Sequence, residues 1–536
     1  MACTTSSDDA SSIFGLDQDK PEIHISKQEQ NSQSHKELDH PQHEIIASID
    51  TKRDVEEPPV EKVSSQMLRD PNLVTWDSDN DPANPHNWSL KRKWAVVFVV
   101  SAFTFISPVS SSMIAPALGN MKIDLGIRDD FEAAMTLSIF VLAFALGPLL
   151  FGPLSELYGR VRVLQCSNLI FLIFNIVCGF ARTGPQMLAF RYFAGFGGSA
   201  LLALGGGILA DTFDADHRGQ AIGIYSVCPL LGPAVGPVAG GFITENTTWR
   251  WVFWSTTIFC ALVQITGLLF LQETYAPILL KRKAAKLRKE SGNPALYTEF
   301  DDPDRKLTTD LRTAFERPFR LLFTQPIVQV ISVYMAYNYG LLYLMLTSFP
   351  TLWTKRYGES LGIGSLHYIG LGIGLFLGSQ ITAPLSDRIY KKLKHRNGGI
   401  GKPEFRVPLM FVGAAITPMA LFWYGWSAQA RTHWIVPTIG AGVFAAGTII
   451  NYGCMQAYIV DSYTRYAASG LAATAVLRSL SGFSFPLFAN TLFAKLGYGW
   501  GNSLLGFVAI AFGIPAPLIF WRFGERLRAR SEYAAG

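Results

Sequence analysis

Beyond residue 93, long apolar stretches alternate with short charged segments along the chain. Ten of the stretches contain no Asp, Glu, Lys or Arg, and two more contain a single charge each, Arg191 and Arg478. A helix needs about 20 apolar residues to cross the hydrocarbon layer of a membrane, so each stretch is long enough. The twelve stretches are residues 94–118, 133–155, 163–181, 186–210, 219–244, 251–272, 325–354, 360–386, 407–430, 434–460, 466–494 and 496–521.

None of these stretches alternates with a period of two, as the lipid-facing strands of a β-barrel do. Backbone groups that lie in lipid must be hydrogen-bonded within the protein, and helices satisfy them within one segment. We therefore expect an all-α membrane protein with twelve transmembrane helices.

The two halves of this pattern share a short repeat. Residues 152–160 read Gly-Pro-Leu-Ser-Glu-Leu-Tyr-Gly-Arg, and residues 383–391 read Ala-Pro-Leu-Ser-Asp-Arg-Ile-Tyr-Lys. Asp211 follows the fourth stretch as Asp461 follows the tenth. Parallel repeats of six helices are typical of transporters in which two bundles rock around a midplane site. We predict a six-helix bundle over residues 91–273, a cytosolic central loop over 274–324 and a second six-helix bundle over 325–523.

Charge is distributed unevenly along the chain. Residues 1–90 contain 18 acidic and 7 basic residues, which predicts a disordered acidic cytosolic tail. In the rest of the chain, segments on the N-terminal side of the membrane contain 29 Lys and Arg, against 8 on the opposite side. The positive-inside rule then places both termini in the cytosol, including a short tail over residues 524–536.

Composition narrows the function. Only 16% of the residues are charged, whereas soluble chains contain about 25%, so a soluble enzyme and a nucleic-acid binder are excluded. No nucleophile–base pair or metal cluster occurs at a useful spacing, and we expect neither enzyme activity nor a cofactor or metal. The sequon at Asn246 falls on an outer loop, where glycosylation would make the chain a glycoprotein.

The repeated loop after the second stretch is the first candidate for function. An acidic side chain at the membrane edge can bridge to a helix of the other bundle and latch one conformation. A tight turn with ordinary cytosolic arginines explains part of the motif, but it does not explain the repeat. The predicted latch residues are Gly152, Leu154, Glu156, Gly159, Arg160, Arg162, Asp387 and Arg388.

The fifth stretch carries glycines and prolines at helical spacing. Gly232, Gly236 and Gly240 fall on one face of a helix, where small residues allow a neighbouring helix to approach closely. The prolines of the stretch bend the helix. Plain helix packing is the alternative explanation. The complete motif consists of Gly232, Pro233, Gly236, Pro237, Gly240 and Gly241.

Two arginines lie inside predicted spans. Each costs about 2.5–3.5 kcal/mol on membrane-insertion scales, so Arg191 is expected to be functional. Arg478 fits a functional cation and a structural one equally well. No Asp or Glu lies in the middle of a span, so the proton carrier of a pump is not evident, and His367 has no evident partner.

Polar and aromatic side chains gather in the second half of the chain. In a membrane such groups either join neighbouring helices or line a water-filled cavity. As a set they suit a cavity for a planar lipophilic molecule, neutral or anionic, and not a polyamine. The predicted cavity residues are Tyr337, Asn338, Tyr339, Tyr343, Gln380, Asn451, Gln456 and Arg478.

The loop and fifth-span motifs resemble those of the major facilitator superfamily, and most closely its fungal twelve-span drug:proton antiporters. Residues 84–88, 249–251 and 273–277 also match that family, although Glu156 stands where the family usually has Asp. The resemblance implies an efflux pump for drugs or a secondary metabolite. It also implies that Arg191 takes part in proton coupling, with Asp211 as a further candidate, and that the fifth span limits proton leak.

The expected partners are a small-molecule substrate, protons and membrane lipid, without nucleic acid, for a monomer in the plasma membrane or the vacuolar membrane. An uptake symporter or facilitator stays an alternative. So does a non-transporting membrane sensor that signals through the acidic tail, and deleting residues 1–80 would separate a sensor from an exporter.

Overall fold

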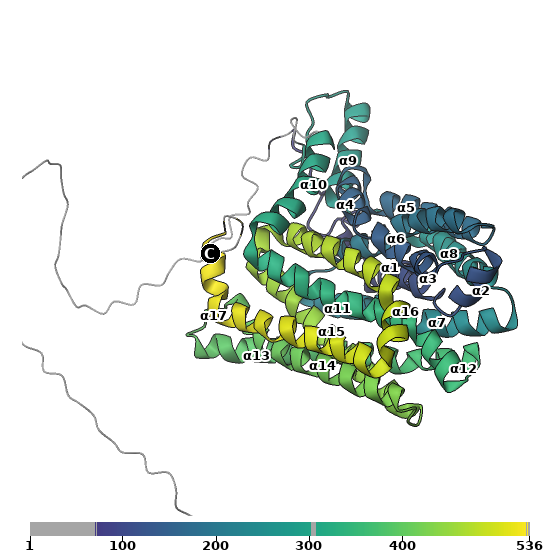
Figure 1. Ribbon diagram of the computed structural model, residues 1–536. Helices are drawn as coiled ribbons and strands as arrows, with labels where there is room; N and C mark the ends of the chain where they lie inside the picture. The colour runs from purple at the N-terminus through teal and green to yellow at the C-terminus, as the bar shows by residue number, and fades with distance from the viewer. Residues whose placement is uncertain (1–69, 71, 302–306, 532, 534–536) are drawn as a thin grey trace, which may run out of the picture. The chain divides into compact units, whose positions relative to one another are not determined.

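The computed structural model describes residues 70, 72–301, 307–531 and 533, and all structural statements below refer to these residues. Most of the predicted acidic tail, residues 1–69 and 71, lies outside them. Within the described ranges the chain is helical and contains no strand beyond an isolated bridge between Leu73 and Tyr297 (Figure 1).

The predicted all-α membrane architecture is confirmed. Eleven helical segments of the described chain are long and apolar enough to cross a membrane. The last of these, Ala467–Ala529, contains two of the twelve predicted stretches. They are separated at Gly497, whose backbone angles (φ 70°, ψ 175°) interrupt the helix.

The first half of the chain provides six spans, of which the second is built from two consecutive helices. Its helices are α1 (Leu90–Ser112), α2 (Leu118–Asp124), α3 (Asp130–Ala143), α4 (Gly147–Tyr158), α5 (Arg160–Cys178), α6 (Gly184–Thr212), α7 (Ala215–Asn246) and α8 (Arg250–Phe270). The predicted central loop contains two helices, α9 (Ala276–Ser291) and α10 (Leu307–Thr324).

The second half repeats the pattern of long helices. It contains α11 (Pro326–Thr351), the π-helical turn η2 (Leu352–Tyr357), α12 (Leu361–Leu366), α13 (Tyr368–Arg396), the 3-10 turn η3 (Pro403–Arg406), α14 (Val407–Gln429), α15 (Ile435–Ser462), α16 (Ala467–Gly513) and α17 (Pro515–Ala529). Below, the "α9 end" is the end of the helices where α1 begins, and the "α12 end" is the opposite end (Figure 1).

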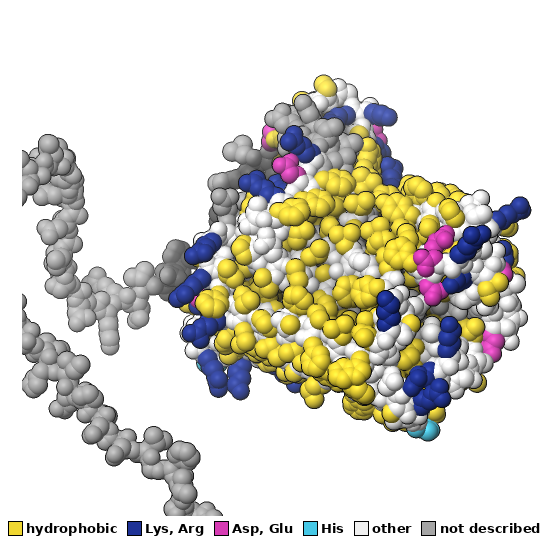
Figure 2. All heavy atoms as spheres, in the orientation of Figure 1, with side chains coloured by type: hydrophobic (Ala, Val, Ile, Leu, Met, Phe, Trp, Pro, Cys, Tyr) yellow, Lys and Arg dark blue, Asp and Glu magenta, His cyan; other side chains and the backbone are white. Residues whose placement is uncertain are grey.

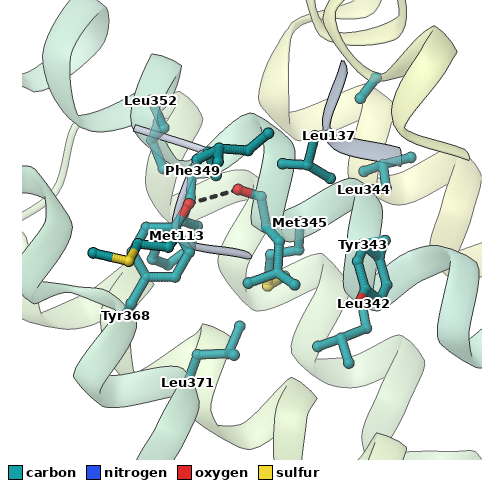
Figure 3. Packing of buried hydrophobic residues seen from close by; sticks show 14 of the residues in the cluster. Met113, Leu137, Leu342, Tyr343, Leu344, Met345, Phe349, Leu352, Tyr368 and Leu371 are labelled. Atoms are coloured by element: carbon teal, nitrogen blue, oxygen red, sulfur yellow. Dashed lines mark hydrogen bonds between the residues drawn. The ribbon is translucent and has the colours of Figure 1, made fainter. Parts of the chain in front are cut away.

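Three clusters of buried apolar residues hold the helices together. One lies within the first half and one within the second. The third joins the halves, because Met113 and Leu137 of the first half pack with Met345 and Phe349 of the second (Figure 3). Helix α7 also packs against α12 and α13, and α3 against α16. The halves therefore share a core toward the α12 end.

The outer surface fits a lipid environment. Hydrophobic side chains cover most of the middle of the face seen in Figure 2, and Lys and Arg lie toward its edges. On α8, Leu269 is 72% exposed and Phe270 64% exposed. Exposed apolar surface of this extent is unfavourable in water, so it indicates contact with lipid tails.

The segment before α1 differs from the expected disordered tail. The Lys283 ammonium of α9 donates to the Asp77 carboxylate (2.6 Å) and to the Thr75 carbonyl (3.0 Å). The backbone N–H groups of Asp77 and Ala83 bond the Asp81 carboxylate and lower its pKa, so it stays charged beside Lys283. These bonds order the segment against α9.

Candidate functional site

Arg191 of α6 is fully buried between the helices of the first half. Its Nε donates to the Thr136 carbonyl (3.2 Å), and its two terminal nitrogens donate to the carbonyls of Ser110 (3.1 Å) and Ser111 (3.4 Å). The guanidinium lies 4.4 Å from the centre of the Phe140 ring. The centre of the Phe253 ring lies 5.9 Å away. Among the described residues, three backbone carbonyls and two aromatic faces surround the charge and no carboxylate pairs with it.

A hydrogen bond leads from this arginine into the second half. The Ser111 hydroxyl lies 2.9 Å from the Tyr343 hydroxyl of α11. The rings of Tyr343 and Tyr339 are 5.0 Å apart, one helical turn from each other. Ser111 was not among the predicted site residues, although three consecutive serines inside an apolar stretch, residues 110–112, were a signal for it.

Arg478 of α16 completes this row of side chains. Its guanidinium lies 4.9 Å from the Tyr339 ring centre and 5.7 Å from that of Tyr452, and it donates to the Tyr452 hydroxyl. Gln456 donates to the same hydroxyl (3.2 Å). The Nε of Arg478 is buried and has no hydrogen-bond partner in the described part of the chain.

We name these side chains the arginine cluster, which crosses from one half to the other. It consists of Arg191, Ser111, Tyr343, Tyr339, Arg478, Tyr452 and Gln456. The cluster carries two cations and, in the described chain, no carboxylate bonded to either.

The other predicted cavity residues lie elsewhere. The Tyr337 hydroxyl donates to the Leu505 carbonyl, and the Asn338 amide donates to the Tyr334 carbonyl (2.8 Å) within α11. These two side chains are buried between helices of the second half. Asn451 is also buried and donates to Thr417 (3.4 Å). Gln380 is exposed on α13.

The glycine face of α7 lies against α1. A Cβ on Gly232 would lie 2.5 Å from the Pro108 side chain, and one on Gly236 would lie 2.7 Å from the Val109 carbonyl oxygen. One on Gly240 would lie 2.0 Å from the Met113 carbonyl oxygen. Only glycine therefore permits this approach of the two backbones.

The same helix also reaches the second half. A Cβ on Gly241 would lie 2.1 Å from the Ser365 hydroxyl of α12. The carboxylate of Glu245, one turn further along α7, accepts a hydrogen bond from the backbone N–H of Gly362 at 2.6 Å. Helix α7 is thus fixed between α1 and α12.

At the α9 end, Arg160 lies at the centre of an ion-pair cluster of the first half. Its Nε donates to Asp211 (2.6 Å) and its backbone N–H donates to Glu273 (2.9 Å). Its guanidinium lies 4.8 Å from the Tyr275 ring centre. Gly159 has φ 104°, and a Cβ there would lie 2.2 Å from the Glu273 carboxylate, so glycine is required.

A corresponding cluster surrounds Arg406 in the second half. Its Nε donates to Asp461 (3.0 Å) and its Nη1 donates to Asp387 (2.5 Å). Next to it, the buried Glu404 carboxylate accepts from Arg528 of α17 (2.9 Å). Glu273, Arg406 and the Glu404–Arg528 pair were not among the predicted site residues.

The predicted latch and coupling residues therefore separate into groups. Arg160, Asp211 and Asp387 take part in ion pairs, whereas Arg162 and Arg388 are exposed. Of the remaining latch residues, Gly159 directly follows α4. The other three lie on α4, where Glu156 is exposed, Leu154 is half-buried and Gly152 has open space beside it.

Asp211 and Arg191 do not share one site. They are 20 residues apart on α6, which corresponds to about 30 Å at 1.5 Å per residue. Any joint role in proton coupling would have to act over that distance.

At the α12 end, a groove of about 650 Å³ lies between the halves. It is lined by α2, the start of α3, the end of α11 with η2, and the part of α16 around Gly497. Lys122, Lys355, Arg356 and Arg431 contribute to its lining, against one acidic residue, Asp130. The groove is therefore basic.

His367, for which the sequence offered no partner, has two. Its Nε2 lies 2.8 Å from the Glu359 carboxylate, and its Nδ1 lies 2.9 Å from the Thr438 hydroxyl. Glu359 precedes α12 and Thr438 lies on α15, so only folding brings the three together. Asn246, the predicted glycosylation site, is the exposed last residue of α7 at this same end.

Known proteins match the chain over most of its length. The model of the Major Facilitator Superfamily matches residues 100–486. The efflux pump vrtL of Penicillium aethiopicum is 54% identical over 468 residues, which cover 87% of this chain and 92% of that protein. The efflux pump radE of Floropilus chiversii is 43% identical over 467 residues, which cover 87% of this chain and 86% of that protein.

Solved structures match the fold. A bacterial homologue of the human lysosomal transporter Spinster, inward-facing and unoccupied, gives a TM-score of 0.59 at 17% identity, covering 83% of this chain and 99% of that one. The xylose transporter XylE from E. coli, partially occluded and inward open, gives 0.58 at 15% identity, covering 81% and 98%. At these identities the likeness concerns the fold alone.

Proposed function

The chain belongs to the major facilitator superfamily, and on that premise we propose that it is a proton-coupled exporter of small lipophilic compounds that works by alternating access. It is a multi-pass membrane transporter, since its helices are long and apolar enough to span a bilayer and its relatives are transporters. The names of the relatives vrtL and radE, both efflux pumps, support the outward direction of transport.

The observation that carries alternating access is the different way in which the two ends are held. At the α12 end the halves share a buried core, and α7 is fixed between α1 and α12. At the α9 end, the Arg160 and Arg406 clusters each bind helices of their own half. Helix α10 of the central segment packs against both α4 and α16 at this end, so there the halves are linked through the connecting segment. Two internally braced halves whose common buried core lies at the other end can rock about that core.

The arginine cluster supports the choice of substrate. Two arginines to which no carboxylate of the described residues is bonded repel organic cations and attract an acidic group. Tyr339, Tyr343 and Tyr452 offer aromatic faces to a planar molecule. We therefore propose substrates that are planar, lipophilic and neutral or anionic.

The proposed location is the plasma membrane, with the α9 end in the cytosol as the positive-inside count predicts. Asn246 would then lie outside the cell, open to glycosylation. If Asn246 is glycosylated, glycosidase treatment should make the protein migrate faster in electrophoresis, and the protein should be labelled at the cell surface. Labelling of the vacuolar membrane alone would contradict this location.

The test of the function uses the purified full chain in vesicles with an imposed pH difference. The probe is a planar anionic dye, with spermidine as the comparison. We expect the dye to move against its gradient, to stop on addition of a protonophore, and spermidine not to move. Downhill flux that ignores the pH difference would indicate a facilitator and overturn the proposed coupling.

A further inference from the structure

His367 occupies the junction between α12 and α13, with only 7% of its side chain exposed. Both ring nitrogens have an oxygen partner within hydrogen-bond distance: Glu359 at Nε2 and Thr438 at Nδ1. The Thr438 hydroxyl lies 2.8 Å from the Trp434 carbonyl as well. The hydroxyl has one proton, which it can donate either to His367 Nδ1 or to the Trp434 carbonyl.

The direction in which the Thr438 hydroxyl donates its proton sets the number of protons on the His367 imidazole. When the hydroxyl donates to Nδ1, the ring is neutral and donates from Nε2 to the Glu359 carboxylate. When the hydroxyl donates to the Trp434 carbonyl, Nδ1 must donate to Thr438. The contact between Nε2 and Glu359 then needs a second proton, which makes His367 an imidazolium beside a carboxylate. The same heavy-atom arrangement holds both states, and only the hydroxyl rotates.

One face of the imidazole is covered by an aromatic ring. The indole of Trp353 stacks on the imidazole with ring centres 3.6 Å apart and an interplanar angle of 19°. An imidazolium over an indole face gains a cation–π attraction that the neutral ring does not. Glu359 is 20% exposed, so protons can exchange between the pair and the solvent at this end.

Other charged groups surround the pair. Glu245 of α7 binds the backbone of Gly362 on α12, while Arg356 of η2 donates to the carbonyls of Ala428 (3.0 Å) and Gln429. His433 packs on Trp434, whose ring centre is 5.5 Å from that of His367. Lys355 of η2 and Arg431 line the basic groove nearby. None of these groups bonds the imidazole, so among the described residues Glu359 is its only charged hydrogen-bond partner.

From this geometry we infer that His367 and Glu359 form a proton-binding site at the α12 end, which takes up the proton that drives export. The inference rests on the proposed function, because a proton-coupled exporter needs a proton carrier and no Asp or Glu lies in the middle of a predicted span. The site lies on the connection between α11 and α13, and Glu245 ties that connection to α7 of the other half. A change of charge there acts directly on the junction about which the halves rock.

The test compares H367Q with the matched control H433Q in vesicles. Glutamine keeps a polar side chain but cannot bind a proton. We expect H367Q to lose dye accumulation driven by the pH difference while keeping dye exchange at equal pH on both sides. H433Q is expected to keep both activities. Gradient-driven accumulation by H367Q equal to that of the unmodified protein would overturn the inference.

A direct titration separates this inference from the proposed function. Imidazolium quenches a stacked indole, so tryptophan fluorescence of the unmodified protein should fall as the pH is lowered. The part of this fall that comes from the His367–Trp353 stack should be lost in H367Q and in W353F. It should persist in H433Q, which removes only the quenching of Trp434 by His433. If the unmodified protein shows no proton-driven transport, the proposed function fails whatever the titration gives. If the titration is unchanged in H367Q, the proton site fails even though transport is proton-driven.

Discussion

In the first half of the chain, the guanidinium of Arg160 lies over a tyrosine ring and binds Asp211. In the second half, Arg406 lies over Tyr390 and binds Asp461 in the same way. Both arginines also reach a serine of the repeated Pro-Leu-Ser sequence through Nη1. Each cluster joins elements of its own half at the α9 end.

The two clusters reach this geometry from different sequences. Arg160 follows its serine, Ser155, by five residues, whereas Arg406 follows Ser386 by twenty. The residue five positions after Ser386 is Lys391, which is exposed. The cluster therefore depends on the position of the guanidinium between an acidic residue and a tyrosine, and not on its spacing from the serine. A longer loop can place an arginine at that position.

The clusters also differ in burial. The side chains of Arg160 and Asp211 are 17% and 19% exposed. Arg406 is 18% exposed, but its partners Asp461 and Asp387 are 29% and 60% exposed. Because water screens the second cluster more, the first should contribute more to stability. Arg191 and Arg478, each inside a predicted span, repeat this contrast, since Arg191 is buried and Arg478 is half-buried.

The largest effect is expected from R191A, which removes the enclosed cation of the first half. The carbonyls of Thr136, Ser110 and Ser111 would lose the guanidinium that donates to them. The hydrogen bond between Ser111 and Tyr343 would lose its connection to a cation. We expect gradient-driven export to be abolished while folding and membrane targeting are intact. Flux assays and surface labelling check this, with R182A, an exposed arginine before α6, as the control. Normal export by R191A would contradict the role of the cluster.

The next effect is expected from R160A, which leaves Asp211 without its cation. Removing one partner of a largely buried pair costs about 3 kcal/mol of unfolding free energy. Thermal unfolding in detergent measures the loss. The exposed neighbour gives a matched control, and R162A should leave the melting temperature nearly unchanged. Equal melting temperatures for both variants would show that the pair contributes no stability.

A smaller and selective effect is expected from R478Q. If its guanidinium binds the acidic group of a substrate, its removal weakens binding of an anionic dye by about 2 kcal/mol. A neutral planar dye should bind R478Q as it binds the unmodified protein, and Q380A should bind both dyes normally. Equal loss for the two dyes would make Arg478 a structural cation.

The smallest effect is expected from R406A. Its acidic partners can turn to water, so the loss is about 1 kcal/mol, below that of R160A. The same unfolding experiment ranks the two variants. A larger loss of unfolding free energy for R406A than for R160A would show that the second cluster contributes more stability than the first.

The helices could be predicted because lipid imposes a long uncharged stretch on every span, and the repeat located Ser155 and Ser386 because it is local. The partners could not. Glu273 binds the backbone of Arg160 from 113 residues away, and no spacing rule links them. A signal did exist in residues 273–277, where the family-like sequence begins with this glutamate.

The arginine cluster was predicted in part for the same reason. Tyr339, Tyr343 and Arg478 were found because polar groups inside spans are conspicuous. Their association with Ser111 depends on how the two halves meet, which hydropathy does not encode. Asn338 and Asn451 look identical in sequence to cavity residues, yet they bond helices of the second half.

The bonds from Lys283 to Thr75 and Asp77 also decide where the chain can be shortened. Removing residues 1–80 would cut through an anchored segment, and the ammonium of Lys283 would be left with the carboxylate of Asp81 alone. A loss of activity after that deletion would then report damage to α9 and not a signalling role of the tail. Deleting residues 1–69 keeps Thr75, Asp77 and Asp81 bonded to Lys283, so this shorter deletion can distinguish a sensor from an exporter.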